Sequence, residues 1–313
     1  MQTRVKIKYD DSNSPKTKAW MESIFDKTYL MEDIDVYHRI CQFREKVWGL
    51  FEESADGAGD IWCYLIDGPE KAMLIDTGFG IGNLKGVVER LVGTKELYVA
   101  NTHEHLDHAM GNYQFGRAFC HMNAVSSIVG KLMTPTVWDH LYDENGVGIW
   151  LDFDPKDIIA YQPYELIPIL EGHVFDLGGG HEIEVVHTPG HAAGGISFID
   201  KKNRILFSGA MHTNYIGIGG RPGYYHDYHT VDAFLESLYR LRDKHFDEFD
   251  KILPSHEIVD LDKSFILDQI KACEDVIKDH NCYEFTALTK HGSELRYHAC
   301  GDAGVRFTER SFR

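Results

Sequence analysis

The chain has 313 residues, 43% hydrophobic and 26% charged, so it can bury the core of one large domain or two modest ones beneath an ordinary soluble surface. Its 32 basic and 49 acidic residues give a formal net charge of −17, which excludes the basic stripes of nucleic-acid-binding proteins and attraction to anionic lipid. No apolar run approaches the ~20 residues that span a bilayer, and residues 1–20 lack the apolar stretch of a secretory signal, so we expect a cytoplasmic protein without nucleic-acid or membrane partners.

The first clear elements follow a weakly patterned extension at residues 1–30, which includes a turn-prone stretch from Asp10 to Pro15. Apolar runs at 61–66 and 72–75 flank an Asp-Gly-Pro-Glu segment, and this order predicts a β-hairpin. Apolar residues with helical spacing over 84–92 then predict an amphipathic helix.

A metal-ligand motif follows the next element, a short buried strand at 96–101. The run from Thr102 to His108 reads Thr-His-Glu-His-Leu-Asp-His, so three imidazoles and one carboxylate fall in the order His-x-His-x-Asp-His. This donor set suits zinc and other borderline divalent ions far better than calcium or magnesium. The 18 histidines of the chain crowd at ligand spacing only here, so we interpret the run as a metal-binding loop rather than a His-rich surface loop.

The remaining elements divide between an insertion and a second run of strands and helices. Residues 125–165 are rich in Trp, Tyr, Asp and Pro and predict a helical or irregular insertion. Strands are predicted at 173–175, 182–187, 195–200, 204–207 and 249–253, and helices at 231–242 and 263–278. No low-complexity tract or Pro-rich linker divides the chain, so we expect a single domain over residues 1–313, with a core at about 60–260 and a C-terminal helix and tail at about 261–313.

Two histidines outside the motif also follow predicted strands. His191 comes after a Thr-Pro-Gly turn, and His256 comes after Pro-Ser. Proline fixes the backbone and glycine adopts conformations that other residues avoid, so such a turn can aim an imidazole at a fixed point. A lone His after Pro is more often a surface residue, but two of them added to the motif favour one shared metal centre.

Together these motifs resemble the metallo-β-lactamase fold superfamily of hydrolases. The matching segments appear in the family's order and cover roughly residues 60–260: Leu74–Gly78, Thr102–His108, Thr188–His191, Leu206–Gly209 and Pro254–His256. The resemblance implies an α/β fold, a four-layer αβ/βα sandwich of two mixed β-sheets flanked by helices, with the metals at one edge.

The resemblance also implies one or two bound zinc ions. The matching ligands are His103, His105 and His191 for the first zinc and Asp107, His108 and His256 for the second. Asp76 matches a residue whose carboxylate fixes the loops near the ligands, with a plain strand-end turn residue as an equal alternative. Glu104 and His187 match positions that the family leaves variable, so we do not expect them to bind metal.

One position departs from the family. After the Ser-Gly that ends the strand at 204–207, the family usually has an Asp that bridges both metals, and this chain has Ala210. A methyl group cannot bind metal, and its presence should weaken metal binding at least as much as the ~10–100-fold typical of losing a supporting partner. Three accounts compete: an inactivating replacement that leaves an enzyme able to hold its substrate, a natural enzyme with one tightly held zinc, or His212 as a substitute ligand.

Zinc lowers the pKa of bound water toward neutrality, so the resemblance implies hydrolysis by hydroxide without a Ser or Cys nucleophile. Asp107 would be catalytic as well as a ligand, because it orients the attacking water and passes a proton to the leaving group. We therefore predict a zinc-dependent hydrolase of a small-molecule ester, lactone, thioester or amide, impaired here by Ala210. The alternatives are a phosphodiesterase acting on a small nucleotide and a non-catalytic, metal-dependent binding protein.

The sequence assigns no substrate-binding residue, but two aromatic segments are expected to flank the metals and favour an apolar or ring-bearing substrate. The insertion supplies Trp138, His140, Tyr142, Trp150 and Phe153, and the loop at 213–228 supplies Tyr215, Tyr224, Tyr225 and Tyr228. Core packing or dimer contacts are an equal alternative for these side chains, and Arg221 is a weak candidate for binding an anionic group. The insertion and the family favour a homodimer, the commonest symmetric assembly. Six scattered cysteines without a C-x-x-C pair are typical of reduced thiols.

Overall fold

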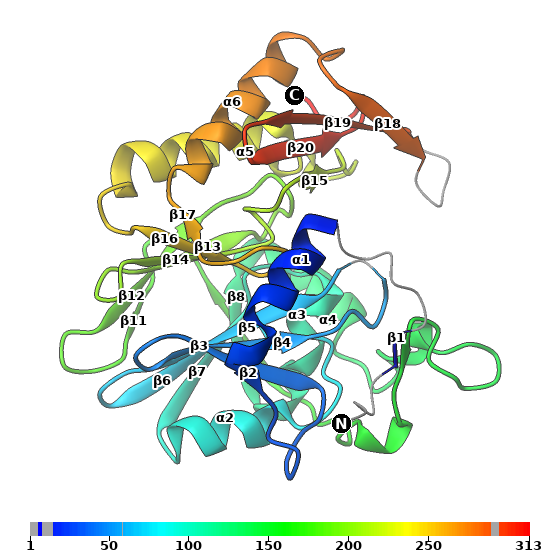
Figure 1. Ribbon diagram of the computed structural model, residues 1–313, viewed down its shortest axis with the longest axis vertical. Coiled ribbons are helices and arrows are strands. Elements are labelled where there is room, and N and C mark those ends of the chain that lie inside the picture. The colour runs from blue at the N-terminus through cyan, green and yellow to red at the C-terminus, as the bar shows by residue number, and fades with distance from the viewer. Residues whose placement is uncertain (1–5, 8–14, 58, 289–293) are drawn as a thin grey trace.

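The computed structural model shows two large β-sheets packed face to face, with helices on the outer face of each (Figure 1). The predicted αβ/βα sandwich is therefore confirmed. The structure describes residues 6–7, 15–57, 59–288 and 294–313. Of the turn-prone stretch near the N-terminus, residues 10–14 lie outside this description.

The first sheet has eight strands in the order β10-β8-β7-β6-β5-β4-β3-β2. Its strands are β2 (Thr28–Tyr29), β3 (His38–Arg44), β4 (Val47–Glu52), β5 (Ile61–Asp67), β6 (Lys71–Ile75), β7 (Glu96–Ala100), β8 (Arg117–His121) and β10 (Glu165–Ile169). The predicted hairpin is the antiparallel pair β5–β6, and the predicted helix is α2 (Leu84–Val92). Helix α2 connects the parallel neighbours β6 and β7, as a parallel crossover requires.

The second sheet has six strands in the order β11-β12-β13-β14-β16-β17. Its strands are β11 (Val174–Asp176), β12 (Glu182–His187), β13 (Ile196–Asp200), β14 (Ile205–Gly209), β16 (Lys251–Pro254) and β17 (Leu261–Asp262). Helix α5 (Val231–Arg240) connects the parallel pair β14–β16, and α6 (Phe265–Lys278) follows β17. Every residue of β13 and β14 is buried, because both faces of this sheet are covered.

Three apolar layers hold the sandwich together. One lies between the first sheet and helix α2, and a second between the two sheets, where Trp62, Phe175 and Phe198 are almost fully buried. The third lies between the second sheet and helices α5 and α6. The ends of the central strands therefore sit in a rigid frame, which is where functional side chains can be held in place.

Part of the insertion at 125–165 packs into the core. It contains α4 (Val125–Lys131) and β9 (Leu151–Asp152), and β9 pairs with β1 (Lys6–Ile7). Trp138 and Phe153 are 6% exposed and belong to the core beneath the first sheet. The Trp138 indole N–H donates to the carbonyl of Phe79 at 3.0 Å. For these side chains core packing is correct, and the expected role beside the metals is wrong.

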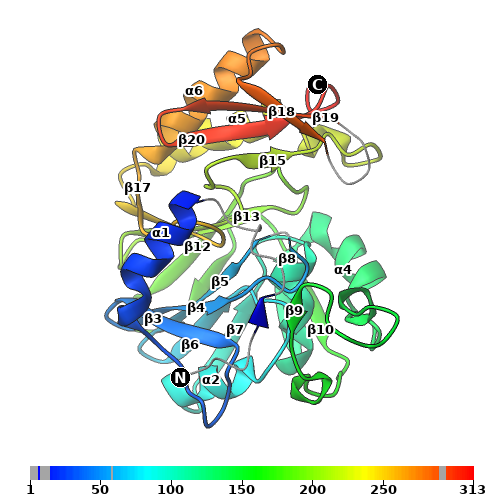
Figure 2. The same cartoon turned by 45° about the vertical axis from the view of Figure 1, so that its right-hand side comes forward.

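The expected C-terminal tail forms a third sheet. Its strands are β15 (Ile216–Ile218), β18 (Phe285–Leu288), β19 (Glu294–Cys300) and β20 (Ala303–Phe307), in the order β15-β20-β19-β18. This sheet packs against α6 and lies at the top of the molecule in Figures 1 and 2. A helix α1 (Pro15–Ile24) and strands β2–β4, none of them predicted, precede the hairpin.

Within the described residues, no helix is both long and apolar enough to cross a membrane. All six cysteines are free thiols, as their spacing predicted.

Candidate metal centre

The structure brings the six predicted ligands into two compact groups. In each group the donor atoms lie within 4.8 Å of one another: His103, His105 and His191 form the first, and Asp107, His108 and His256 form the second. The motif residues follow β7 and form the short helix α3 (Leu106–Ala109), while the other two histidines follow β12 and β16. Three separate strand ends therefore supply one site.

The first group has the spacing of a single coordination sphere. His105 Nδ1 lies 3.0 Å from His103 Nε2 and 3.0 Å from His191 Nε2. A tetrahedral zinc about 2.0–2.1 Å from each nitrogen would hold neighbouring ligands about 3.3 Å apart. The three nitrogens thus need to move only slightly to share one ion.

The second group is equally tight and includes the carboxylate. His108 Nε2 lies 3.1 Å from His256 Nε2. Asp107 Oδ2 is 3.4 Å from His108 Nε2 and 3.2 Å from His256 Nε2. Two imidazole nitrogens and one carboxylate oxygen are a donor set that suits zinc.

Hydrogen bonds on the far side of the rings show which nitrogens are free to bind a cation. His191 Nδ1 contacts the Gly217 carbonyl at 2.6 Å, and His256 Nδ1 contacts the Asp60 carbonyl at 2.7 Å. A carbonyl only accepts, so both Nδ1 atoms carry hydrogen, and the Nε2 atom of each ring is the nitrogen that faces its ligand group. In the first group the His191 Nε2 atom faces another imidazole nitrogen at 3.0 Å, and a cation stabilises such facing lone pairs in a buried site, so the arrangement fits a metal.

Asp76 joins the loops that carry the ligands. Its backbone is left-handed, with φ of 62°, and its side chain is fully buried. The carboxylate accepts hydrogen bonds from the Thr102 N–H at 2.7 Å, the Thr102 hydroxyl at 2.8 Å and the Ser255 hydroxyl at 3.1 Å. It also contacts His108 Nδ1 at 2.8 Å, which directs the Nε2 atom of that ring into the second group. Asp76 thus contacts both the Thr102 backbone and the His108 ring, so it does more than end a strand, and its role in positioning a metal ligand stays a prediction.

A second buried polar cluster supports the loop that follows Asp76. Glu52 Oε2 accepts the Phe79 N–H at 2.9 Å and lies 3.6 Å from His38 Nε2, while His38 Nδ1 lies 3.1 Å from Asp35 Oδ1. All three side chains of the cluster are completely buried. Burial by itself lowers the pKa of His38, yet the two carboxylates raise it to about 10. The imidazolium therefore neutralises two buried acids.

The two ligand groups differ in charge before any cation binds. Burial lowers the pKa of all three histidines of the first group, that of His191 to about 3, so this group is neutral. Burial also opposes protonation of His108, but Asp107 and Asp76 raise its pKa to about 10. A cation entering the second group must therefore displace a proton from His108.

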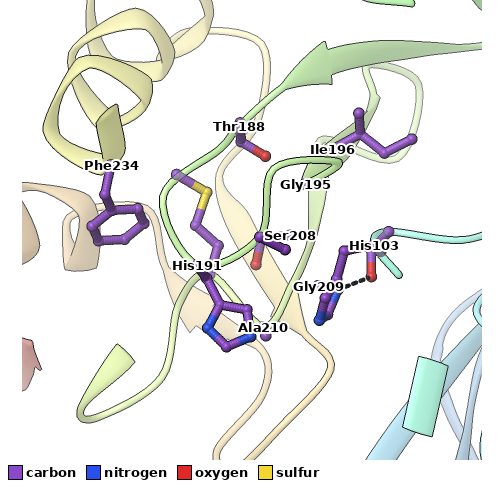
Figure 3. Close-up of a pocket in the computed structure, with 12 residues that line it drawn as sticks. His103, Thr188, His191, Gly195, Ile196, Ser208, Gly209, Ala210 and Phe234 are labelled. Carbon is purple, nitrogen blue, oxygen red and sulfur yellow. Dashed lines mark hydrogen bonds between the residues drawn. The ribbon is translucent and has the colours of Figure 1, made fainter. Parts of the chain in front are cut away.

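Ala210 occupies the position of the family's bridging carboxylate. It follows the last residue of β14 and lines a small cavity with His103 and His191 (Figure 3). His212 is fully buried, its ring centre lies 6.1 Å from that of Phe265, and it belongs to neither ligand group. To become a ligand, His212 would have to leave the core next to α6. In this arrangement His212 does not take the place of the missing Asp, and the account in which it moves to do so stays a prediction.

A cleft of about 250 Å³ opens over the two groups. Its lining beyond the ligands includes Glu257 and the residues Tyr215, Tyr297 and Arg306 of the C-terminal part of the structure. Tyr297 and Arg306 were not expected at the site, because the sequence predicted no strands in their part of the chain. Of the expected loop aromatics, Tyr215 lines the cleft, whereas Tyr224 is 94% exposed and lies outside its lining.

Glu104 and His187, which were not expected to bind metal, lie outside both ligand groups. Glu104 is 8% exposed. The His187 ring stacks on His121, with centres 4.0 Å apart, and its Nε2 contacts the Ala193 carbonyl at 3.0 Å.

Comparison with known families and proteins agrees with this geometry. The model of the metallo-beta-lactamase superfamily matches residues 56–256. The acyl-coenzyme A thioesterase MBLAC2 of Homo sapiens is 31% identical over 225 residues, which cover 66% of this chain and 75% of that protein. The Gallus gallus protein of the same name is 27% identical over 226 residues, covering 66% of this chain and 74% of its own length.

Solved structures share the fold. A metallo-beta-lactamase from Pontibacter korlensis superposes with a TM-score of 0.54 at 15% identity, over 76% of this chain and 99% of its own. The DIM-1 metallo-beta-lactamase gives a TM-score of 0.54 at 16% identity, over 77% of this chain and 99% of its own. At this identity the likeness concerns the fold alone.

Proposed function

Because the chain belongs to the metallo-beta-lactamase superfamily, we propose that it is a zinc-dependent hydrolase of a small-molecule thioester of the acyl-coenzyme A class. The observation that carries the proposal is the convergence of six donor side chains from three strand ends into two groups of three. Catalytic zinc sites typically have three protein ligands and one open position, and each group supplies that number. The thioesterase names of the relatives select the substrate class within the superfamily.

The chemistry requires a water to add to the thioester carbonyl carbon and the C–S bond to break. Zinc, when bound, supplies polarisation of the carbonyl and a lowered pKa for water. Asp107 Oδ2 lies 3.4 Å from His108 Nε2 and 3.2 Å from His256 Nε2, and in this position the carboxylate can hold the attacking water and accept its proton. The departing thiolate is a weaker base than an alkoxide or an amine, so it needs little help from a general acid.

Impairment by Ala210 is part of the proposal. Without the bridging carboxylate the two groups share no ligand, and each is left with three protein donors. We expect the second site to be the weaker, because binding there must release the His108 proton. An inactivating replacement and a one-zinc enzyme both remain compatible with this arrangement.

We also propose that the protein works in a reducing, cytoplasmic environment. Its six free cysteines support this location. A phosphodiesterase is the alternative within the same site chemistry. The relatives' names and the net charge of −17 favour the thioester over a nucleotide polymer.

The test is thiol release from a panel of acyl-coenzyme A thioesters by the zinc-loaded chain, measured with a thiol-reactive dye. We expect release that a chelator abolishes, that zinc restores, and that His103→Ala or Asp107→Asn reduces to background. Cleavage of phosphodiesters without any thiol release would overturn the thioesterase proposal in favour of the alternative.

A further inference from the structure

The cleft is completed by a part of the chain outside the superfamily match. That match ends at residue 256, whereas Tyr297 and Arg306, which line the cleft, lie on β19 and β20. Strand β15 links this sheet to the metal centre, because the Gly217 carbonyl accepts the Nδ1 hydrogen of His191. The C-terminal sheet is therefore attached to the metal site and adds a wall that the shared fold does not supply.

The strand register places four residues in one row across this sheet. Gly217 of β15 is opposite Arg306 of β20, Arg306 is opposite Tyr297 of β19, and Tyr297 is opposite Phe285 of β18. Residues directly opposite each other project from the same face of a sheet. With strands about 4.8 Å apart, the row extends about 14 Å from Gly217, whose carbonyl is hydrogen-bonded to His191, to Phe285 on the edge strand β18. Figures 1 and 2 show the four strands in this order.

Glycine at the start of the row lets the Arg306 side chain lie across the sheet. A Cβ atom at Gly217 would come within 2.8 Å of Arg306 Nε and 3.2 Å of one of its terminal nitrogens. The guanidinium thus lies over the residue whose carbonyl orients His191. Any side chain at position 217 would push it away from the metal site.

Arg306 has no acidic partner among the residues that the structure describes, although the chain carries 49 acidic residues. On the neighbouring strand, Arg296 pairs with both Glu294 and Glu309. Of the two acids in the cleft lining, Asp107 belongs to the second ligand group and Glu257 accepts the Asn214 N–H at 2.6 Å. Arg306 therefore presents its fork of donors to the cleft, in the geometry that binds phosphate or carboxylate in a bidentate manner.

The outer half of the row is an aromatic surface. The rings of Tyr297 and Phe285 stack at 4.5 Å and 14°, and the Tyr215 ring meets Tyr297 edge-on at 5.4 Å. Phe285 is 47% exposed, so a flat apolar face is open to solvent beyond the cleft. Aromatic faces of this kind stack planar bases without regard to their hydrogen-bonding pattern.

We propose that the row from Gly217 to Phe285 binds the thiol portion of the thioester, with Arg306 on a phosphate group and the Tyr297–Phe285 pair against a planar ring. This inference rests on the proposed thioesterase function, which supplies the substrate class. Because Arg306 lies beside the metal centre, this order fits a nucleotide-bearing thiol whose flexible arm between sulfur and phosphate is folded back over the cleft. The acyl group is then left to the opposite side of the reacting carbonyl.

The experiment measures binding rather than turnover, by calorimetry with the zinc-loaded chain and three free thiols. Coenzyme A carries phosphates and a base, phosphopantetheine carries a phosphate only, and pantetheine carries neither. The thiol is common to all three, so its contact with zinc cancels in the comparison. Arg306→Gln should weaken coenzyme A and phosphopantetheine at least about tenfold and leave pantetheine unchanged, and Phe285→Ala should weaken coenzyme A alone, by about fivefold or more.

Arg310→Gln is the matched control, because it removes the same charge from an exposed residue outside the cleft lining and should change none of the three affinities. Thermal melting checks that each variant is folded. Equal affinity of the three thiols, or an Arg306→Gln loss that is the same for pantetheine, overturns the subsite. Binding in the predicted order supports the subsite, and it overturns the proposed function if neither this chain nor its Ala210→Asp form hydrolyses any thioester. Thioester hydrolysis with affinities that do not depend on the phosphate or the ring supports the proposed function and overturns the subsite.

Discussion

Replacing Ala210 with aspartate should restore a shared metal ligand and raise activity. Ala210 is 7% exposed and lines both the small cavity beside His103 and His191 and the cleft that contains Asp107 and His256. A carboxylate there adds an oxygen donor between two groups that each have three. We expect zinc affinity at the weaker site to rise at least ~10–100-fold, about 1.4–2.7 kcal/mol, with a comparable rise in kcat/KM for a thioester.

Ala210→Asp should lower the melting temperature when zinc is absent and raise it when zinc is bound. A buried carboxylate without a partner costs free energy, so the Ala210→Asp chain should melt at a lower temperature than the unchanged chain when a chelator is present. Zinc binds the native state only, so it should reverse that order. Calorimetric melting with and without zinc measures both signs, and chelator competition measures the affinity.

Ala210→Asn is the matched control, because it has nearly the same size as aspartate and no charge. It should reproduce neither the gain in zinc affinity nor the gain in rate. If the aspartate chain binds zinc no more tightly and hydrolyses thioesters no faster than the unchanged chain, position 210 is not a missing ligand and the reasoning is refuted. Equal rates would also remove the account in which this residue inactivates the enzyme.

Three further outcomes follow from the buried polar groups. Asp76→Asn should lower zinc affinity ~10–100-fold in chelator competition, because it loses the charge that orients His108, and an unchanged affinity would contradict that role. The pKa of His108 is raised to about 10 before metal binds, so the zinc affinity of the second site should rise about tenfold per pH unit up to that value. Calorimetry in buffers of different ionisation enthalpy should show the released proton. A zinc affinity that does not change with pH would contradict this role of His108. His38→Gln leaves two buried carboxylates without their cation and should lower the free energy of unfolding by about 3–5 kcal/mol in urea near neutral pH. The folded-state pKa of His38 is raised to about 10, so its contribution to the free energy of unfolding is complete below the unfolded pKa of about 6.5 and is lost as pH rises through 10. The difference in unfolding free energy between the unchanged chain and His38→Gln should therefore shrink as pH rises. A difference that stays constant would exclude the charge-based explanation.

The ligands could be found from the sequence because each is local to a strand end. The His-x-His-x-Asp-His run directly follows β7, and His191 and His256 follow β12 and β16 after short turns with proline. Apolar patterning predicted those strands, and the resemblance to the superfamily, which implies metals at one edge of the sandwich, made convergence of the side chains from the two sheets foreseeable. The same local signals predicted the β5–β6 hairpin and helix α2 within a residue of their observed bounds.

The cleft wall could not be found this way, because it depends on pairing between distant segments. Strand β15 has three residues inside a Gly-rich loop, and its partner β20 begins at Ala303, far along the chain. Neither is long enough to show alternation by itself. The prediction that Trp138 and Phe153 flank the metals was wrong for a different reason. These residues show no regular spacing in the sequence, yet irregular backbone buries them in the core.

The central claim is that side chains from three strand ends jointly bind metal. Anomalous diffraction recorded above and below the zinc absorption edge, on crystals grown with excess zinc, tests it most directly. The account predicts a strong peak about 2.0–2.1 Å from His103 Nε2, His105 Nδ1 and His191 Nε2, with a second, weaker peak among Asp107, His108 and His256. A map without a peak at either position, with these rings turned away from one another, would contradict it.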